Sequence, residues 1–197
     1  MPIEYTSVDS AMSQEEMLLQ NPKMQAPLEV LTQLECRDVA YYGFDGNIHQ
    51  GQIIMHNKAI EDVVLFFKQA LLLHFPIQSV IPISDTKYKW DDETSCDSNN
   101  SSGYNFRYIA GTTKMSNHAR GLAFDINPVQ NPYIKYNEES VELWRAPKNA
   151  AYDTSIPGTL FRGHPLVELL KSKGWKWGGD WKKEEGPVDY QHFEKVI

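Results

Sequence analysis

The chain has 197 residues, of which 41% are hydrophobic and 23% charged, and its formal net charge is -7. This length favours one sizeable core, and the composition excludes disordered, collagen-like and coiled-coil proteins. The negative charge disfavours nucleic acid as a partner, and no run approaches the roughly 20 apolar residues that cross a bilayer, so we expect no membrane insertion.

The N-terminal region differs from the rest of the chain. Residues 1–36 are predicted to be an extension that precedes a main domain of residues 37–197. Within the extension, residues 13–20 favour a short helix, and Pro22 and Pro27 interrupt any continuation. The start of the chain lacks the basic and apolar regions of a secretory signal.

The main domain is expected to begin with a hairpin. Two strand-like runs flank Asp45-Gly46, a dipeptide that suits a tight turn between antiparallel strands. Apolar residues then recur at helical spacing from residue 60 to residue 74, with Asn57 as the predicted N-cap and Pro76 as the stop. Residues 77–83 predict a strand beside the hairpin.

The second half alternates loops with regular elements. Residues 84–106 are polar and predict a surface loop, and residues 127–162 predict a long binding loop or lid. Residues 122–126 and 190–197 favour strands, and residues 164–173 favour a helix. This order predicts an α+β fold.

Three residues predict a metal site. Zinc catalysis needs three nitrogen or oxygen ligands with one position left open. His118 and Asp125 are seven residues apart, which on a straight strand would place them on opposite faces, so a turn at Gly121 must intervene. His192 is the predicted third ligand, because a strand containing it could pair with the strand of Asp125.

Other interpretations of these residues exist. Asp125 could pair with Arg120 without any metal, and His118 or His192 could be structural. A carboxylate near the metal could take a proton from water, and both Asp189 and Glu194 are candidates from their positions alone.

Three segments carry a family resemblance: SNHARGLAFDINPVQNPY, GWKWGGDW and DYQHFE. Together they resemble the zinc-dependent D-alanyl-D-alanine carboxypeptidases and L-alanyl-D-glutamate peptidases related to VanX and VanY. The resemblance extends from about Tyr41 to the C-terminus. It implies a small antiparallel sheet with helices packed on it, as in the hedgehog signalling domain, and makes residues 37–197 a zinc peptidase catalytic domain.

The resemblance also implies roles for individual residues. One Zn²⁺ ion would be held by His118, Asp125 and His192, and the general base falls on Asp189. The family places an arginine ahead of the first motif to bind substrate and stabilise the charged intermediate, and Arg107 occupies that place. Ser116 and Trp177 are implied substrate contacts.

The activity implied is hydrolysis of peptidoglycan stem peptides, by release of the terminal D-alanine. The alternatives are an L-alanyl-D-glutamate endopeptidase and, outside enzymes, a zinc-stabilised binding module. We expect a monomer that is periplasmic or extracellular if an export signal has been removed, and cytoplasmic otherwise. Cys36 and Cys96 allow one disulfide or two free thiols.

Overall fold

A long antiparallel hairpin organises the first half of the molecule, a computed structural model that describes residues 5–109 and 111–197. Strands β2 (Leu34–Gly43) and β3 (Ile48–His56) pair along their whole lengths. The turn between them contains Gly46 at a φ of 82°, so the predicted Asp45-Gly46 hairpin is confirmed. The short strands β1 (Ser7–Val8) and β4 (Pro76–Ile77) complete a sheet in the order β1-β3-β2-β4.

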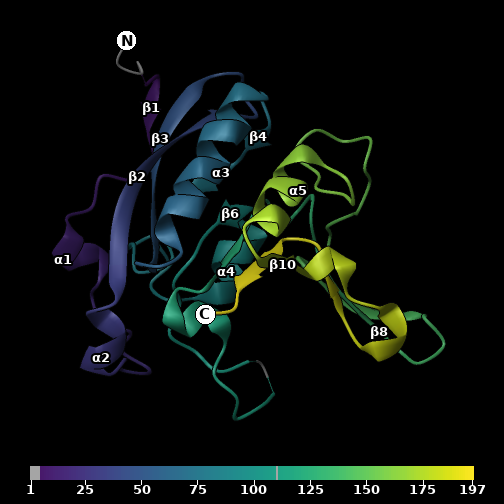
Figure 1. Ribbon diagram of the computed structural model, residues 1–197. Coiled ribbons are helices and arrows are strands. Elements are labelled where there is room, and N and C mark those ends of the chain that lie inside the picture. Colours follow the sequence, from purple (N-terminus) through teal and green to yellow (C-terminus); the bar gives the residue numbers. More distant parts are fainter. Residues whose placement is uncertain (1–4, 110) are drawn as a thin grey trace.

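Helix α3 (Ile60–Leu72) packs against this hairpin (Figure 1). The helix is confirmed, but its predicted N-cap is wrong, because Ala59 occupies that position and no side chain caps the helix. Only part of the apolar repeat that predicted the helix is buried: the buried face contains Ile60, Val63, Phe66, Phe67 and Ala70, whereas His74 lies beyond the helix and is exposed.

The N-terminal segment packs on the same half of the molecule. Helix α1 (Gln14–Met17) is capped by Ser13, whose side chain accepts a hydrogen bond from the Glu16 amide while the Glu16 carboxylate accepts from the Ser13 amide. Helix α2 (Leu28–Leu31) lies further along the chain. Met17 is buried, and its carbonyl accepts a hydrogen bond from Ser84.

Residues 84–106 are not the surface loop that their composition predicted. They contain helix α4 (Asp92–Asp97) and strand β6 (Asn100–Ser101), which pairs with β5 (Ser79–Val80). The predicted strand at 77–83 is therefore split between β4 and β5. Four aromatic side chains of the segment are buried: Tyr88, Trp90, Tyr104 and Phe106.

Buried hydrogen bonds explain why this polar segment can lie inside the molecule. The Asn100 side-chain oxygen accepts hydrogen bonds from the Ser79 hydroxyl and the Ile81 amide, at 2.9 and 3.0 Å. Its amide group donates to the Ile81 carbonyl and to the Ser95 hydroxyl. A polar side chain that is fully hydrogen-bonded can be buried without a large desolvation penalty.

A second sheet forms in the C-terminal half, in the order β10-β12-β7. Its strands are β7 (Ala123–Asp125), β10 (Trp175–Trp177) and β12 (His192–Lys195), and all pairs are antiparallel. Helix α5 (Pro165–Ser172) begins after the His164 N-cap and contacts both β10 and α3. The predicted strands and the second predicted helix are confirmed here.

The predicted lid at 127–162 contains regular structure that its sequence did not predict. Strands β8 (Tyr133–Tyr136) and β9 (Glu142–Ala146) form a hairpin, and β11 (Val188–Asp189) adds to it in the order β11-β8-β9. In Figure 1 this sheet lies on the opposite side of the molecule from β1. The described residues also contain three short 3₁₀ helices: η1 (Asn117–Arg120), η2 (Gly178–Asp180) and η3 (Lys183–Glu185).

The architecture is mixed, with several small sheets and separate helices, and is consistent with the α+β prediction. The main core joins both halves through aromatic contacts, such as the edge-on pair of Phe66 and Phe124 and the stacked pair of Phe124 and Phe193. Cys36 and Cys96 are free thiols. Among the described residues, no helix combines the length and apolarity needed to span a membrane.

Candidate metal centre and active site

A tight turn brings His118 back toward the strand of Asp125. Gly121 ends η1 in the left-handed region at a φ of 65°, and a Cβ atom there would lie 2.5 Å from the His56 amide nitrogen. Both observations require glycine. The turn predicted at Gly121 is confirmed, and Ser116 begins η1 by accepting a hydrogen bond from the His118 amide.

His192 and Asp125 are direct partners in neighbouring strands. They lie opposite each other in the antiparallel register of β12 and β7, so their side chains share one face of the sheet. His192 Nδ1 lies 3.1 Å from Asp125 Oδ1.

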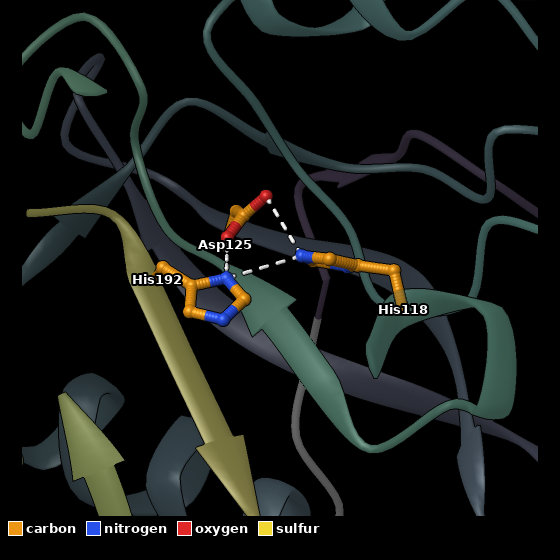
Figure 2. Close-up of side chains that lie close together, drawn as sticks. All are labelled: His118, Asp125 and His192. Atoms are coloured by element: carbon orange, nitrogen blue, oxygen red, sulfur yellow. Dashed lines mark hydrogen bonds and ion pairs between the residues drawn. The ribbon is translucent and has the colours of Figure 1, made fainter. Parts of the chain in front are cut away.

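The three predicted ligands converge on one point (Figure 2). His118 Nε2 lies 3.2 Å from His192 Nδ1 and 3.3 Å from Asp125 Oδ2. One ligand atom from each residue lies within 4.8 Å of the others, and both histidines are buried. The structure thus brings together two imidazole nitrogens and a carboxylate from three separate elements.

The remaining ring nitrogen of each histidine already has a partner. His118 Nδ1 lies 2.7 Å from the Gly103 carbonyl, and His192 Nε2 lies 3.5 Å from Glu194, which also accepts a 2.7 Å hydrogen bond from Asn117. Such outer partners fix the orientation of metal-binding histidines and raise their basicity. The sequence did not predict the role of Gly103 and indicated Glu194 only as a candidate base.

These residues fit a zinc ion. Ligands about 2.0–2.1 Å from a tetrahedral ion lie about 3.3 Å from one another. The two inward nitrogens are 3.2 Å apart, and each lies close to one oxygen of Asp125: His192 Nδ1 is 3.1 Å from Oδ1 and His118 Nε2 is 3.3 Å from Oδ2. Two nitrogens and one oxygen are a ligand set of catalytic zinc sites, which keep the fourth position open.

Charge–charge interactions dominate the titration of the cluster. Burial disfavours the charged form of Asp125, but the nearby His118 and His192 outweigh burial and hold the pKa of Asp125 well below its usual value. Burial likewise opposes protonation of His192, but hydrogen bonds to Asp125 and Glu194 raise its pKa. A metal ion would have to displace that proton, so metal binding should weaken in acid.

Asp189 has a different environment from the other carboxylates. Burial raises its pKa to about 7, and the negative charge of Asp125 acts in the same direction, while His192 and His118 oppose the rise. Its Oδ1 atom is buried without a hydrogen-bond partner. Glu194, in contrast, has its pKa lowered to about 2 by its hydrogen bond with His192. Of the two candidate bases, Asp189 has the pKa suited to exchanging protons near neutral pH.

Arg107 lies on the segment that runs beside His118. Its carbonyl accepts a hydrogen bond from the Ser116 amide, and the Asn105 amide donates to the His118 carbonyl. The guanidinium contacts Asp92 at 3.0 Å, and its Nε atom is buried without a partner. The backbone of this segment is therefore tied to the turn that carries His118, and the guanidinium is held by Asp92 with one donor unused.

The aromatic prediction needs a correction. Trp177 is only 2% exposed and donates a hydrogen bond to the Tyr190 carbonyl, so it is mainly a core residue. Trp181, in contrast, is 36% exposed, and its ring centre lies 5.6 Å from that of His192. Both tryptophans border a cavity of about 220 Å³ between α5 and β10.

A cluster of two histidines and an aspartate, with a further carboxyl group close by, is an arrangement that suits a hydrolytic metal centre. Residues 110–195 match the family described as D-alanyl-D-alanine carboxypeptidase. The matched part contains all three cluster residues and Asp189, and it supports the peptidase family that the resemblance predicted. The match supports a cell-wall peptidase. No solved structure matched the chain.

Proposed function

We propose that the protein is a zinc metallopeptidase that hydrolyses peptidoglycan stem peptides as a D-alanyl-D-alanine carboxypeptidase. The observation that carries the proposal is the convergence of His118, Asp125 and His192 on one point, with the unpartnered carboxyl group of Asp189 nearby. We include in the proposal a fold of the kind shared by the D,D-peptidases and the hedgehog signalling domain.

The three cluster residues would hold the ion. When bound, zinc supplies a Lewis acid that polarises a carbonyl group and makes a water molecule acidic near neutral pH. The partners of the two histidines, Gly103 and Glu194, keep their donor nitrogens directed at one another before any ion binds. A site oriented in advance loses little conformational entropy on binding.

Asp189 would move the proton. Its buried, unpartnered Oδ1 can accept a proton from the attacking water and then donate it to the nitrogen of the departing amino acid. A pKa near 7 allows both transfers at neutral pH. This group also argues against a purely structural zinc module, which has no need of a base.

Arg107 would bind negative charge. Its side chain, which is 30% exposed, can hydrogen-bond either the oxyanion that develops at the scissile carbonyl or the free carboxylate of a terminal D-alanine. Recognition of a terminal carboxylate is what a carboxypeptidase needs, and an endopeptidase does not. An arginine that binds the terminal carboxylate fits the carboxypeptidase, whereas one that binds the oxyanion fits the L-alanyl-D-glutamate endopeptidase equally well.

Mass spectrometry of stem peptides digested by the zinc-loaded protein tests the specificity. We expect loss of one terminal D-alanine. Products cut between L-alanine and D-glutamate would instead establish the endopeptidase, and intact peptides would contradict the proposed function.

The variant Asp189→Asn tests the mechanism. It removes the proton acceptor but leaves all three metal ligands, so kcat should fall by about 10²- to 10⁴-fold while bound zinc is unchanged. In acid the wild-type rate should also fall, because protonated Asp189 cannot act as a base. Full activity in this variant would exclude Asp189 as the base.

A further inference from the structure

The small sheet that contains Asp189 has one covered face and one open face. Val188, Ile134 and Arg145 lie opposite one another in β11, β8 and β9, and Val188 and Ile134 are only 2% and 4% exposed. Side chains alternate between the two faces of a sheet, so the residues next to them point the other way. The second face belongs to Asp189, Tyr133 and Ala146.

Two further residues extend this open face away from the cluster. Lys135 and Trp144 are direct partners in β8 and β9, two positions along from the pair of Tyr133 and Ala146. Lys135 is exposed, and Trp144 is 56% exposed. The rings of Tyr133 and Trp144 touch edge to face, with centres 5.6 Å apart. Tyr133, Lys135 and Trp144 thus form a continuous strip that starts beside the proposed base, and we call it the hairpin strip.

The contact between the hairpin strip and the catalytic carboxyl group is close. Tyr133 is the direct partner of Asp189 in the register of β8 and β11. Burial and the negative charge of Asp189 both raise the pKa of Tyr133 above its usual value. A molecule held at the reaction centre and extending past Asp189 would pass over Tyr133 first.

The chemistry of the strip is mixed. An exposed indole offers a flat apolar face that a pyranose ring can cover with its C–H bonds, and an ammonium group can pair with a carboxylate. A sugar-linked stem peptide has both groups, because its D-glutamate has a carboxylate and its first residue is attached to an N-acetylated sugar. The strip therefore matches the part of such a substrate that is remote from the scissile bond.

The length of the strip agrees with this match. Two strand spacings of about 4.8 Å and a step of two residues along the strand separate Asp189 from Trp144 by about 12 Å. That distance corresponds to roughly three or four extended residues. In a stem peptide, several residues separate the sugar from a terminal D-alanine, whereas L-alanine alone separates the sugar from the bond to D-glutamate. The length of the strip therefore matches cleavage at the terminal D-alanine.

We propose that the hairpin strip is a substrate-binding subsite in which Trp144 packs against the sugar of the substrate and Lys135 pairs with a stem-peptide carboxylate. The proposal rests on the proposed function for the identity of the substrate. It assigns a binding role to a hairpin that carries no predicted catalytic residue and makes the enzyme selective for sugar-linked stems over free peptides.

The test compares Trp144→Ala with wild type on two substrates: a sugar-linked stem peptide and the same peptide without sugar. The KM for the sugar-linked substrate should rise about three- to tenfold, with kcat unchanged and the free peptide unaffected. Trp144→Phe should restore most of the binding. Leu143→Ala is the matched control, because Leu143 is 60% exposed on the same hairpin but lies outside the paired register.

A binding measurement separates this proposal from the proposed function. The free disaccharide of the sugar-linked substrate is titrated into two proteins, Asp189→Asn and the double variant Asp189→Asn/Trp144→Ala. Indole fluorescence should change in the first protein and not in the second. The subsite would be overturned if Trp144→Ala changed the KM of both substrates equally. It would also be overturned if Trp144→Ala changed neither KM and the disaccharide left the indole fluorescence of Asp189→Asn unchanged. A wild-type enzyme that binds the disaccharide but cleaves neither substrate would instead contradict the proposed function alone.

Discussion

Two clusters in the described part of the molecule bring histidine and carboxylate together, and they differ in where the ring nitrogens point. His49 lies between two carboxylates, with Nδ1 3.1 Å from Asp9 and Nε2 3.0 Å from Asp45. Both of its nitrogens are used. In the cluster of His118 and His192, each ring spends one nitrogen on an outer partner and directs the other toward a shared point.

This difference separates an electrostatic clamp from a metal centre. The first cluster has one imidazole and holds β1 against the hairpin, since Asp9 comes directly after β1 and His49 is in β3. The second has two imidazoles whose inward nitrogens would repel or share a proton unless a cation lay between them. Proximity of histidine and aspartate is common to both, so the direction of the free donor atoms is the informative feature.

Replacing one histidine in each cluster should give the largest contrast. His192→Ala removes a ligand and should lower zinc affinity by well over about 100-fold, more than loss of an outer partner does, and abolish hydrolysis. His49→Ala should keep both. Metal analysis of the purified proteins, together with a peptidase assay, provides the check. If the zinc content of His192→Ala equalled that of wild type, His192 would not be a metal ligand.

An intermediate effect is expected at the outer partner of His192. Glu194→Gln keeps the shape of the side chain and its hydrogen bonding but loses the charge, so zinc affinity should fall about 10- to 100-fold. Competition with a chelator of known affinity measures the change. Lys176→Gln, on the neighbouring strand and paired with Glu194, is a control that removes a charge without touching a histidine. Equal affinity in Glu194→Gln and wild type would show that Glu194 does not support the site.

The smallest effect should be the pH dependence of the clamp. Burial disfavours protonation of His49, but Asp45 and Asp9 outweigh it and raise its pKa above 6.5. The stabilisation is therefore fully present below about pH 6.5 and is lost as the pH rises through the folded-state pKa, an effect of about 1 kcal/mol.

Urea unfolding at pH 6 and pH 8.5 tests this sign. The free energy of unfolding of wild type should exceed that of His49→Gln more at the lower pH. A gap that widens with rising pH would contradict a charged His49 in the folded state.

The convergence of the three candidate metal ligands could be predicted from the sequence because local rules place them. Strand parity put Asp125 on one face, the odd seven-residue step required the turn at Gly121, and a short C-terminal strand brought His192 opposite Asp125. The motifs that carry the family resemblance span the same residues. Each of these inferences depends on neighbours in the chain or on one strand pairing.

The parts that escaped prediction depend on distant partners. Residues 84–106 appeared too polar for the interior, yet Asn100 accepts hydrogen bonds from Ser79 and Ile81, which lie outside the segment. The prolines of residues 127–162 obscured the hairpin of β8 and β9. The third strand of that sheet, β11, comes from more than 40 residues further along the chain. The Gly103 carbonyl becomes a partner of His118 only when residues 84–106 fold into the interior, so no local sequence pattern predicts this contact.

The Gly103 carbonyl also joins the metal centre to the buried segment of residues 84–106. A Cβ atom at Gly103 would lie 2.5 Å from the Ile54 carbonyl, so the close packing that positions His118 belongs to the hairpin of β2 and β3 as well. Ligand binding and local unfolding are thermodynamically linked. If the proposed zinc ion binds only the packed state, it protects this segment, and chelation should open the segment to hydrogen exchange and proteolysis before the hairpin itself unfolds.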